Sequence, residues 1–337
     1  MAQRPEAMVV MDRPSFEAHF DPERLARLAD LVGLGGQAWS DELDSANARA
    51  RLSEVEVLVT SWGAPALTPA LLAAAPRLRA VFHCAGSVRA LVTDEVWRRG
   101  LLVTSAADAN AVPVAEFTLA MVILAGKKAP FIAAADAGPP SLSGSARWGD
   151  LSNLRRTIGV VGFSRIGRLV VERLQANLED VTVLVSDPHA DPGEVAAAGV
   201  ELVDLRALLP RVDVLTLHAP ALPSTAGLIG REELALLPDH ATLVNTARGA
   251  LVDHDALAAE CGSGRLFAIL DVTEPEPLPP DSPLRSMPTV LLTPHLAGSL
   301  GSEVHRLTDR ALADLASWCA GEQVADQVSA ESMALRA

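Results

Sequence analysis

Three turns in the sequence carry residues that can pair with ions or exchange protons. Arg248 follows the run LVNTA, Glu276 follows LDVTEP and His295 follows LLTP. A guanidinium can hold a carboxylate through two parallel hydrogen bonds, and an imidazole can give or take a proton near neutral pH. Each turn comes after a predicted strand, and ligands of α/β proteins bind at the carboxyl ends of parallel strands. The sequence therefore predicts one site that contains Arg248, Glu276 and His295.

A second motif, IGVVGFSRIG at residues 158–167, has the order of an apolar strand, a glycine turn and a helix start. Gly162 permits the tight turn, and Gly167 permits close contact between helix and strand. The backbone amides of Arg165 and Ile166 then lie at a helix N-terminus, which favours a pyrophosphate. Ser164 replaces the middle glycine of the G-x-G-x-x-G pattern and places a small side chain near the phosphates. We expect this segment to bind a dinucleotide.

A carboxylate follows at the spacing that this motif requires. Asp187 stands about twenty residues further on, at the end of the predicted strand 181–186, where it can bind the ribose hydroxyls of the adenosine. It would repel a 2′-phosphate, and Pro188 and His189 follow it instead of an arginine. Alone, Asp187 is equally compatible with a turn former before proline. Together with Gly162 and Gly167, it favours NAD over NADP.

The predicted elements around these motifs alternate between strand and helix. With 337 residues, the chain exceeds the usual size of one core, so two domains with a cleft between them are expected. We predict strands at 55–60, 78–83, 157–163, 181–186, 212–217, 241–245, 267–272 and 290–292, and helices at 16–31, 67–75, 110–128, 166–177, 255–260 and 302–320. Loops are predicted at 138–149 and 275–283, and a frayed tail after residue 321. The fold class is α/β, with two Rossmann-like or flavodoxin-like domains that contain parallel sheets.

The composition argues against several classes of partner. A formal charge of −14 opposes binding to nucleic acid and to anionic membrane surfaces. Cys84, Cys261 and Cys319 form no C-x-x-C pair, so neither a disulfide framework nor a thiolate metal site is expected. We expect a cytoplasmic protein without a metal. The N-terminus lacks the order of a signal peptide, and the longest apolar run, 117–126, is too short for a membrane span.

The motifs together resemble the D-isomer-specific 2-hydroxyacid dehydrogenase family, which includes glyoxylate, hydroxypyruvate and phosphoglycerate dehydrogenases and formate dehydrogenase. The resemblance runs from about residue 110 to 299 and is weaker before residue 105. It includes VAE at 114–116, LHAP at 217–220, Thr225, GLI at 227–229 and the three turns described above. Several motifs thus occur in the order and spacing of the family.

This resemblance implies a role for each residue of the predicted site. Arg248 would pair with the substrate carboxylate and contact the keto oxygen. Protonated His295 would donate to the carbonyl oxygen as hydride arrives, and would accept the proton in the oxidation direction. Glu276 would hydrogen-bond the imidazole, orient it and favour its cationic form. The resemblance also implies cofactor contacts at Ala219, Pro220, Thr246, Ala247, Asp271 and Gly298, with Asp271 as the ligand of the nicotinamide carboxamide.

Each of these residues also has a structural interpretation when it is taken singly. Arg248 could cap a helix, Glu276 could lie in a solvated loop, and His295 could satisfy a turn. Their joint occurrence at these spacings favours the shared site. Glu274 is the alternative to Glu276, and His83 and His218 could border the cleft.

The substrate half departs from the family pattern. The family has a G-x-G-x-D loop whose amides bind the substrate carboxylate, whereas this chain has CAGSVR at 84–89. The amides of Gly86 and Ser87 could still bind an acid. Arg89 is either a solvated residue at a helix start or an added anion contact that would favour a larger or more acidic substrate.

The family fold also implies the domain organisation. Residues 1–105 and 299–337 would form a discontinuous substrate-binding domain, and 106–298 the NAD-binding Rossmann domain. The helix from Asn110 and the loop to Trp148 resemble the element through which family members form homodimers. The expected activity is NAD-dependent interconversion of a small 2-keto acid and its D-2-hydroxy acid. The alternatives are an NADP-dependent 2-keto acid reductase and a non-enzymatic NAD-sensing binding protein on the same fold.

Overall fold

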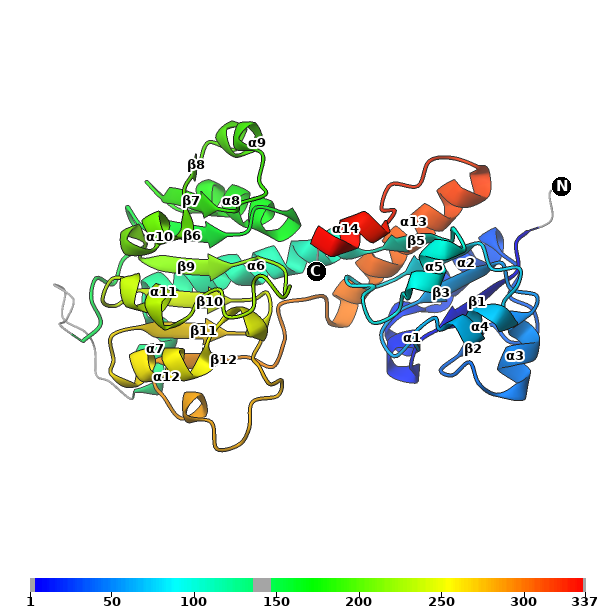
Figure 1. The fold of residues 1–337 in the computed structure, drawn as a ribbon, viewed down its shortest axis with the longest axis horizontal. Helices are drawn as coiled ribbons and strands as arrows, with labels where there is room; N and C mark the ends of the chain where they lie inside the picture. Colours follow the sequence, from blue (N-terminus) through cyan, green and yellow to red (C-terminus); the bar gives the residue numbers. More distant parts are fainter. Residues whose placement is uncertain (1–3, 136–146, 336–337) are drawn as a thin grey trace. The chain divides into compact units, whose positions relative to one another are not determined.

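The chain forms two compact units, each built around one parallel sheet (Figure 1). The structure is a computed structural model that describes residues 4–135 and 147–335. Unit 1 contains the chain up to residue 111 and from 299 onward, and unit 2 contains residues 112–298. The first boundary falls inside helix α6 (Ala107–Gly126), whereas the sequence placed it before this helix. The two sheets confirm the predicted α/β class.

The sheet of unit 1 has five parallel strands in the order β2-β1-β3-β4-β5. Only the strands at 55–60 and 78–83 were predicted in this unit. The strands are β1 (Ala7–Val10), β2 (Trp39–Ser40), β3 (Val57–Thr60), β4 (Ala80–His83) and β5 (Leu102–Ser105).

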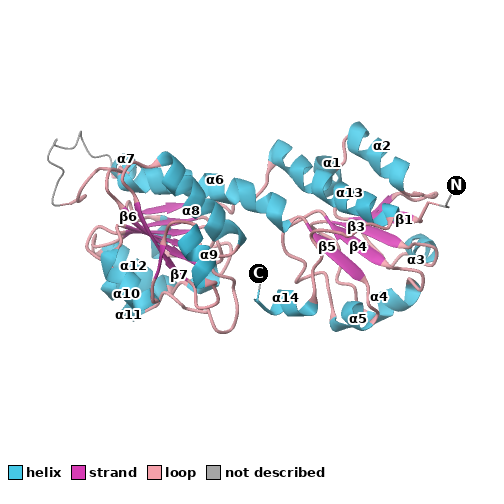
Figure 2. Cartoon of the chain, turned by 90° about the horizontal axis from the view of Figure 1, so that it is seen from above, coloured by secondary structure: helices cyan, strands magenta, loops and turns pink. Residues whose placement is uncertain are grey.

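Helices cover both faces of this sheet (Figure 2). One core cluster includes Val59 and Phe82 from the sheet with Leu28 and Leu315 from the helices on that face. A second cluster on the other face includes Leu58 and the helices that follow β3 and β4. The helices of unit 1 are α1 (Arg13–His19), α2 (Pro22–Leu31), α3 (Ala46–Leu52), α4 (Pro69–Ala74), α5 (Asp94–Arg98), α13 (Val304–Ala320), which a 3-10 turn (Gly301–Glu303) precedes, and α14 (Ala330–Leu335).

The single helix predicted at 16–31 is wrong, because two helices occupy this stretch. Asp21 caps the second helix by accepting a hydrogen bond from the amide of Arg24 at 2.8 Å, and Pro22 occupies its first turn. Proline is favoured at that position because its missing N–H would have no partner there. The apolar spacing continues across the break, so periodicity alone could not reveal it.

The predicted fraying of the C-terminal tail is also wrong. The amide of Val328 donates to the carbonyl of Val103 at 2.8 Å, and Gln327 forms an antiparallel bridge with Thr104. Val328 and Met333 then pack against the core cluster that contains Leu58. The tail therefore covers the open edge of β5, which protects the sheet from pairing with another chain.

The sheet of unit 2 has seven parallel strands in the order β12-β11-β10-β9-β6-β7-β8. The chain order reverses direction at β6, whose neighbours are β9 and β7, and ligands of doubly wound sheets bind at such a switch point. The strands are β6 (Thr157–Val161), β7 (Thr182–Ser186), β8 (Glu201–Leu202), β9 (Val214–Leu217), β10 (Thr242–Asn245), β11 (Phe267–Leu270) and β12 (Val290–Leu292).

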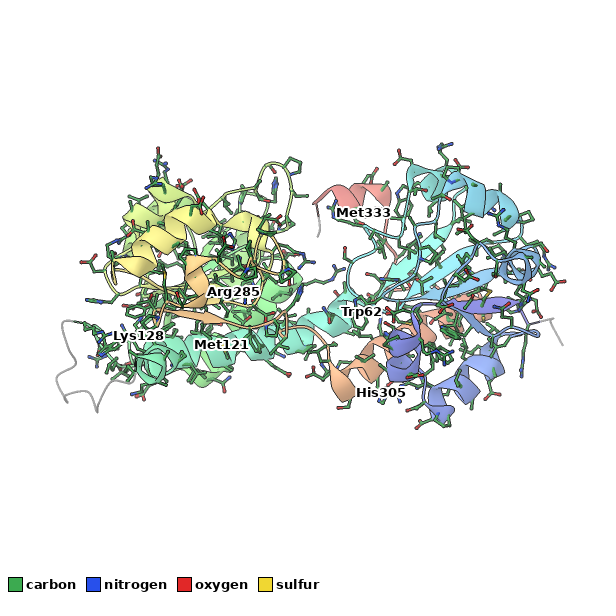
Figure 3. The ribbon with its side chains drawn as sticks, turned by 90° about the horizontal axis from the view of Figure 1, so that it is seen from below. Trp62, Met121, Lys128, Arg285, His305 and Met333 are labelled. Carbon is green, nitrogen blue, oxygen red and sulfur yellow. The ribbon has the colours of Figure 1, made fainter. Side chains whose placement is uncertain are left out.

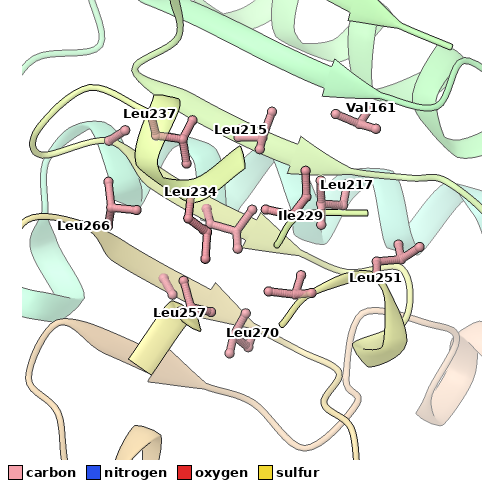
Figure 4. Close-up of a cluster of buried hydrophobic side chains, with 14 of the residues drawn as sticks. Val161, Leu215, Leu217, Ile229, Leu234, Leu237, Leu251, Leu257, Leu266 and Leu270 are labelled. Atoms are coloured by element: carbon pink, nitrogen blue, oxygen red, sulfur yellow. The ribbon is translucent and has the colours of Figure 1, made fainter. Parts of the chain in front are cut away.

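Two core clusters bury the faces of this sheet. One joins Leu215, Leu243 and Leu270 to Leu234 and Leu257 of the covering helices (Figure 4). The other joins Val160 and Phe267 to α6, α7 and α8. The remaining helices of unit 2 are α7 (Ala129–Ala134), α8 (Arg165–Asn177), α9 (Pro192–Ala197), α10 (Leu205–Leu208), α11 (Arg231–Leu236) and α12 (His254–Gly262), with 3-10 turns at Leu209–Arg211, Gly249–Leu251 and Pro283–Arg285.

Helix α6 is, within the described residues, the one helix long and apolar enough to span a membrane. Half of its most apolar window is buried inside the structure. Ala115, Val122 and Ala125 pack in the core of unit 2, and the buried hydroxyl of Thr118 lies 2.8 Å from that of Thr246. These contacts make α6 a core helix. Most of the loop predicted at 138–149, to which the homodimer contact was assigned, lies outside the described residues.

Candidate active site

Four neighbouring strands of unit 2 end in register, so the residues that follow them share one edge of the sheet. Asn245 at the end of β10 pairs with Leu217 of β9 and with Leu270 of β11, and Leu270 pairs with Leu292 of β12. The turns that were predicted to carry the site begin directly after β10, β11 and β12. The structure therefore brings these turns to a common edge, as the sequence indicated.

Asn245 shapes the turn that carries Arg248. Its side chain is fully buried, accepts the amide of Ala247 at 3.0 Å and donates to the carbonyl of Arg248 at 2.8 Å. Arg248 is half-buried, and its guanidinium donates to the carbonyl of Ala247 at 2.6 Å. The turn therefore holds the base of Arg248 in a fixed position at the sheet edge.

Gly249 brings the turn of Arg248 against the turn of Glu276. A Cβ atom at Gly249 would lie 2.0 Å from the backbone carbon of Thr273, far inside van der Waals contact. Glycine is therefore required for this close approach of two backbones. As a result, Arg248 and Glu276 extend from turns that touch each other.

Glu276 and His295 are linked directly through their side chains. Nδ1 of His295 lies 2.8 Å from Oε1 of Glu276, and both side chains are about half-exposed, at 51% and 42%. With Nδ1 engaged by the carboxylate, Nε2 of the same ring is the atom left to exchange a proton with a ligand. His295 has a φ of 56°, a left-handed conformation that is uncommon for a residue with a side chain.

Asp271 fixes the turn that carries His295. One carboxylate oxygen accepts hydrogen bonds from the hydroxyl of Thr293 at 2.6 Å and the amide of Leu296 at 2.7 Å, and the other accepts the amide of Ala297 at 2.9 Å. The backbone carbonyl of Asp271 accepts the amide of His295 at 2.9 Å. Asp271 is 1% exposed, so these bonds stabilise a buried carboxylate. They hold His295 in its left-handed conformation.

The glycine turn has the close contacts that the dinucleotide motif requires. Gly162 has a φ of 97°, and a Cβ atom there would lie 2.7 Å from the backbone of His218 and Ala219. A Cβ atom at Gly167 would lie 2.0 Å from the carbonyl oxygen of Gly162. The N-terminus of α8 is thus packed directly on the end of β6, where its first amides can face an anion.

Asp187 and Ser164 flank this turn. The carboxylate of Asp187 accepts hydrogen bonds from the amide of Phe163 at 2.7 Å and from the amide of His189 at 2.8 Å. These two bonds stabilise the backbone of the glycine turn and of the segment after β7. Ser164 stands before the first residue of α8 and is exposed, and its hydroxyl does not cap the helix. The amides of Arg165 and Ile166 therefore have no side-chain cap from Ser164.

The residues at this edge fit a dinucleotide. Gly162 and Gly167 form a cradle that side chains would fill, and the buried Nδ1 of His218 has no hydrogen-bond partner within the described residues. Burial lowers the pKa of His218 to about 3, so the ring is neutral and carries one donor and one acceptor. His218 follows β9 directly and hydrogen-bonds Thr216 at 3.0 Å through Nε2. Among the described residues, no group of His, Cys, Asp and Glu side chains could hold a metal ion.

The predicted substrate residues Gly86 and Ser87 lie in unit 1, directly after β4. Gly86 is partly buried and Ser87 is exposed. The guanidinium of Arg89 hydrogen-bonds the carbonyl of Met333 on the C-terminal helix. This contact gives Arg89 a structural role that neither sequence interpretation included.

Sequence reasoning missed two residues that support the site. Thr293 anchors Asp271 through its hydroxyl, and Thr118 hydrogen-bonds the predicted cofactor residue Thr246 from helix α6. The position of Thr293, two residues before His295, was a local signal for the first role. Nothing in the sequence around Thr118 identifies its partner, because the two threonines lie far apart along the chain.

Comparison with known proteins agrees with this architecture. Residues 145–297 match the family model described as D-isomer specific 2-hydroxyacid dehydrogenase, NAD binding domain. The chain is 36% identical over 320 residues to a D-3-phosphoglycerate dehydrogenase of Mycobacterium tuberculosis, which covers 91% of this chain and 57% of that relative. The chain thus spans little more than half the length of that relative. It is 30% identical over 324 residues to a glyoxylate reductase of Korarchaeum cryptofilum, which covers 94% of this chain and 95% of the relative.

A solved structure has a similar fold over nearly the whole chain. An NADPH-dependent glyoxylate/hydroxypyruvate reductase of Sinorhizobium meliloti is similar with a TM-score of 0.73 and 25% identity, and the match covers 98% of this chain and 99% of that one. The fold is a two-unit α/β arrangement with a doubly wound parallel sheet in unit 2. The chain belongs to the D-isomer-specific 2-hydroxyacid dehydrogenase family.

Proposed function

We propose that this protein is an NAD-dependent D-2-hydroxyacid dehydrogenase that interconverts a small 2-keto acid and its D-2-hydroxy acid. Membership of the family supports a nicotinamide-dependent oxidoreductase acting on a CH–OH group. The observation that carries the proposal is the hydrogen bond between Glu276 and His295. Asp271 holds the turn of His295, and the turn of Glu276 contacts the turn of Arg248 at Gly249. When bound, the nicotinamide cofactor gives or takes the hydride.

His295 acts as the general acid and base. In the reduction direction the cationic ring donates a proton from Nε2 to the keto oxygen, and in the oxidation direction the neutral ring accepts it. Glu276 holds Nδ1 at 2.8 Å, which fixes the ring orientation and stabilises the cation through the opposite charge. The same atom, Nε2 of His295, thus acts as the acid in reduction and as the base in oxidation.

Arg248 binds the acid group of the substrate. Its planar guanidinium matches a carboxylate and can also donate to the keto oxygen, which gains negative charge as hydride arrives. Gly86 and Ser87 are also proposed as substrate-binding residues, through their backbone amides. A basic fork that fits a carboxylate supports a 2-keto or 2-hydroxy acid as the substrate class.

NAD is the proposed cofactor. Gly162, Ser164, Arg165, Ile166 and Gly167 bind the pyrophosphate, and Asp187 binds the ribose hydroxyls and repels a 2′-phosphate. The structural neighbour from Sinorhizobium meliloti is NADPH-dependent, so the preference between NADH and NADPH is part of the test below. The nicotinamide end is bound by backbone and side chains of Ala219, Pro220, Thr246, Ala247, Asp271 and Gly298.

The assembly and location follow the same proposal. We propose a homodimer in the cytoplasm, in which unit 1 is the substrate-binding domain and unit 2 is the NAD-binding domain that also carries Arg248, Glu276 and His295. The free thiols of Cys84, Cys261 and Cys319 suit a reducing compartment. Sedimentation at micromolar concentration tests the dimer, and a monomer there would contradict it.

The test of the function is oxidation of NADH and NADPH in the presence of 2-keto acids. We expect turnover with at least one acid and a higher kcat/KM for NADH. In the variant Asp187→Ser, the preference for NADH should fall by at least about tenfold, because the repulsion of the 2′-phosphate is removed. The absence of turnover with every acid and both cofactors would overturn the proposal.

A further inference from the structure

We propose that Thr118 of helix α6 is a positioning residue, which makes the hydroxyl of Thr246 a hydrogen-bond acceptor for the amide group of the nicotinamide cofactor. The inference rests on the proposed function and deepens it, because it adds a residue that selects the cofactor through its amide. Both threonines lie in unit 2. Figure 3 shows the side chains of α6, on which Met121, labelled there, lies about one turn beyond Thr118.

The two hydroxyls meet inside the core, where α6 packs on the sheet. Oγ1 of Thr118 lies 2.8 Å from Oγ1 of Thr246, and the two residues are 0% and 5% exposed. Ala115 and Val122, on either side of Thr118 along the helix, belong to the same core cluster as Val244 of β10. The helix and the turn after β10 are therefore joined by a polar contact that water hardly reaches.

The direction of this hydrogen bond follows from a second partner of Thr118. Its Oγ1 lies 2.7 Å from the carbonyl oxygen of Val114, four residues earlier in the helix. A carbonyl has no proton to give, so the hydroxyl proton of Thr118 is donated to Val114. The contact with Thr246 then requires the proton of Thr246. Thr246 therefore donates to Thr118.

A hydroxyl fixed in this way can accept a hydrogen bond from a ligand but cannot donate one. It carries one proton and two lone pairs, and the proton of Thr246 is already used. Within the described residues, Thr118 is the partner that the structure gives to this hydroxyl. The lone pairs that remain match an N–H group and repel the oxygens of a carboxylate or a phosphate, which have no proton.

Asp271 presents further acceptors at the neighbouring strand end. Asn245 at the end of β10 pairs with Leu270 at the end of β11, so Thr246 and Asp271 follow at the same level of the sheet. The amide of Asp271 donates to the carbonyl of Asn245 at 3.0 Å, which ties the two strand ends together. The carboxylate of Asp271 accepts three hydrogen bonds from the turn of His295. Both side chains at this level are thus acceptors.

A primary amide is the group that complements two neighbouring acceptors. Its nitrogen carries two N–H donors, whereas carboxylates and phosphates offer none. The nicotinamide ring carries such an amide, and Thr246 and Asp271 are among the residues proposed to bind this end of the cofactor. A site that is built to hydrogen-bond an N–H group discriminates strongly against an analogue that lacks it.

The first part of the test compares two nucleotides on the full-length protein. Binding of NADH and of reduced 3-acetylpyridine adenine dinucleotide, in which a methyl group replaces the amide nitrogen, is measured by calorimetry. We expect the wild type to bind NADH at least about tenfold more tightly, since the analogue offers no N–H group to the acceptors. Equal affinity for the two nucleotides would overturn the inference.

The second part removes the hydroxyls in turn. In Thr118→Val the proton of Thr246 can turn toward the ligand, so the affinity for NADH should fall at least about fivefold and that for the analogue less than about twofold. Thr118→Ser keeps the hydroxyl and should retain most of the affinity for NADH. Thr246→Val should show the same selective loss, and it carries the test if Thr118→Val does not fold. The double variant should lose no more than either single variant, because the two hydroxyls act as one unit.

Thr289→Val is the matched control. It removes the hydrogen bond from a threonine hydroxyl to the carbonyl of Cys261 at 2.9 Å, just before β12 and hence at the opposite edge of the same sheet. Urea denaturation should show a loss of stability similar to that of Thr118→Val, whereas the ratio of the two nucleotide affinities should stay at the wild-type value. An altered ratio in Thr289→Val would assign the effect to general loosening of unit 2 and overturn the inference.

The outcomes separate this inference from the proposed function. Comparable weakening of both nucleotides in Thr118→Val and in Thr246→Val would overturn the role of the two hydroxyls, and turnover of a 2-keto acid by the wild type would still leave the proposed function standing. The expected selective loss, without turnover of any acid, would support the inference and overturn the proposed dehydrogenase activity. If the wild type binds neither nucleotide, both proposals fail.

Discussion

Nδ1 of His295 lies 2.8 Å from Oε1 of Glu276, although the two residues lie in different turns. The turn of His295 is fixed by Asp271, and the turn of Glu276 follows Thr273, whose backbone contacts Gly249. The pair is therefore positioned by backbone contacts among turns at one sheet edge. This arrangement allows the carboxylate to orient the ring while Nε2 stays available for a ligand.

Removing the charge of Glu276 should slow proton transfer. In Glu276→Gln the amide oxygen can still accept from Nδ1, but it no longer stabilises the cationic ring, so kcat for keto acid reduction should fall at least about tenfold. Initial rates with NADH and a saturating acid measure this. Glu274→Gln is the matched control, because Glu274 is an exposed carboxylate in the same loop. A comparable loss in both variants would assign the effect to the loop and not to Glu276.

Asp271 should matter for both stability and catalysis. In Asp271→Asn the new amide group places a donor against the amide of Ala297 or Leu296, so a buried hydrogen bond is lost at a cost of about 1–3 kcal/mol. Urea denaturation measures the free energy of unfolding, and kcat should fall in parallel as the turn of His295 loosens. Asp239→Asn, at an exposed carboxylate, is the control. Wild-type stability in Asp271→Asn would show that these bonds do not hold the turn.

Gly167 should be irreplaceable in the cofactor turn. A Cβ atom there would lie 2.0 Å from the carbonyl oxygen of Gly162, so Gly167→Ala must displace α8 from β6 at a cost of at least about 1–3 kcal/mol. We expect weaker NADH binding by fluorescence titration and a lower unfolding temperature. Gly36→Ala, where a Cβ atom meets no neighbour within 4 Å, is the control. Unchanged NADH affinity in Gly167→Ala would contradict the assigned turn.

Unit 1 should lose stability in mild acid. Burial and the neighbouring His83 lower the pKa of His19 from its ordinary value of 6.5 to about 3, so the folded unit holds the ring neutral. Between these values the unfolded chain binds a proton that the folded chain excludes. Titration of His19 therefore leaves the free energy of unfolding almost unchanged above pH 6.5. As the pH falls from 6.5 toward 3, it lowers this free energy by about 1.4 kcal/mol per pH unit.

Urea denaturation from pH 7 to about pH 4.5, followed by tryptophan fluorescence, measures this effect, since four of the five tryptophans (Trp39, Trp62, Trp97 and Trp318) lie in unit 1. His19→Gln should show a shallower pH dependence of the free energy of unfolding, and His189→Gln, at an exposed histidine, should match the wild type. An equally steep dependence in His19→Gln would contradict the role of this ring.

The parts of the fold that were predictable are those set by local pattern. The apolar runs of β6, β9, β10 and β11 and the glycine turn at Gly162 depend on neighbours in sequence, and the structure has them near the predicted positions. Parallel strands place their following turns at one edge, so the neighbourhood of Arg248, Glu276 and His295 could also be predicted. The roles of these residues are still proposals.

The remaining features depend on contacts between distant parts of the chain. The apolar pattern around Phe20 continues through the break between α1 and α2, and only the cap at Asp21 marks it. The tail around Val328 is ordered because β5 leaves an open edge, which the sequence of the tail does not indicate. The bond between Thr118 and Thr246 likewise requires the packing of α6 on the sheet.

The most direct test of the proposed catalytic site is the reduction of the preferred 2-keto acid by His295→Gln with saturating NADH. We predict that kcat falls at least about a hundredfold, as expected for loss of a general acid, while NADH still binds with nearly wild-type affinity. Arg248→Ala should lower kcat and raise KM for the acid in the same assay. Wild-type kcat in His295→Gln would contradict the account, because no proton would then pass through this residue.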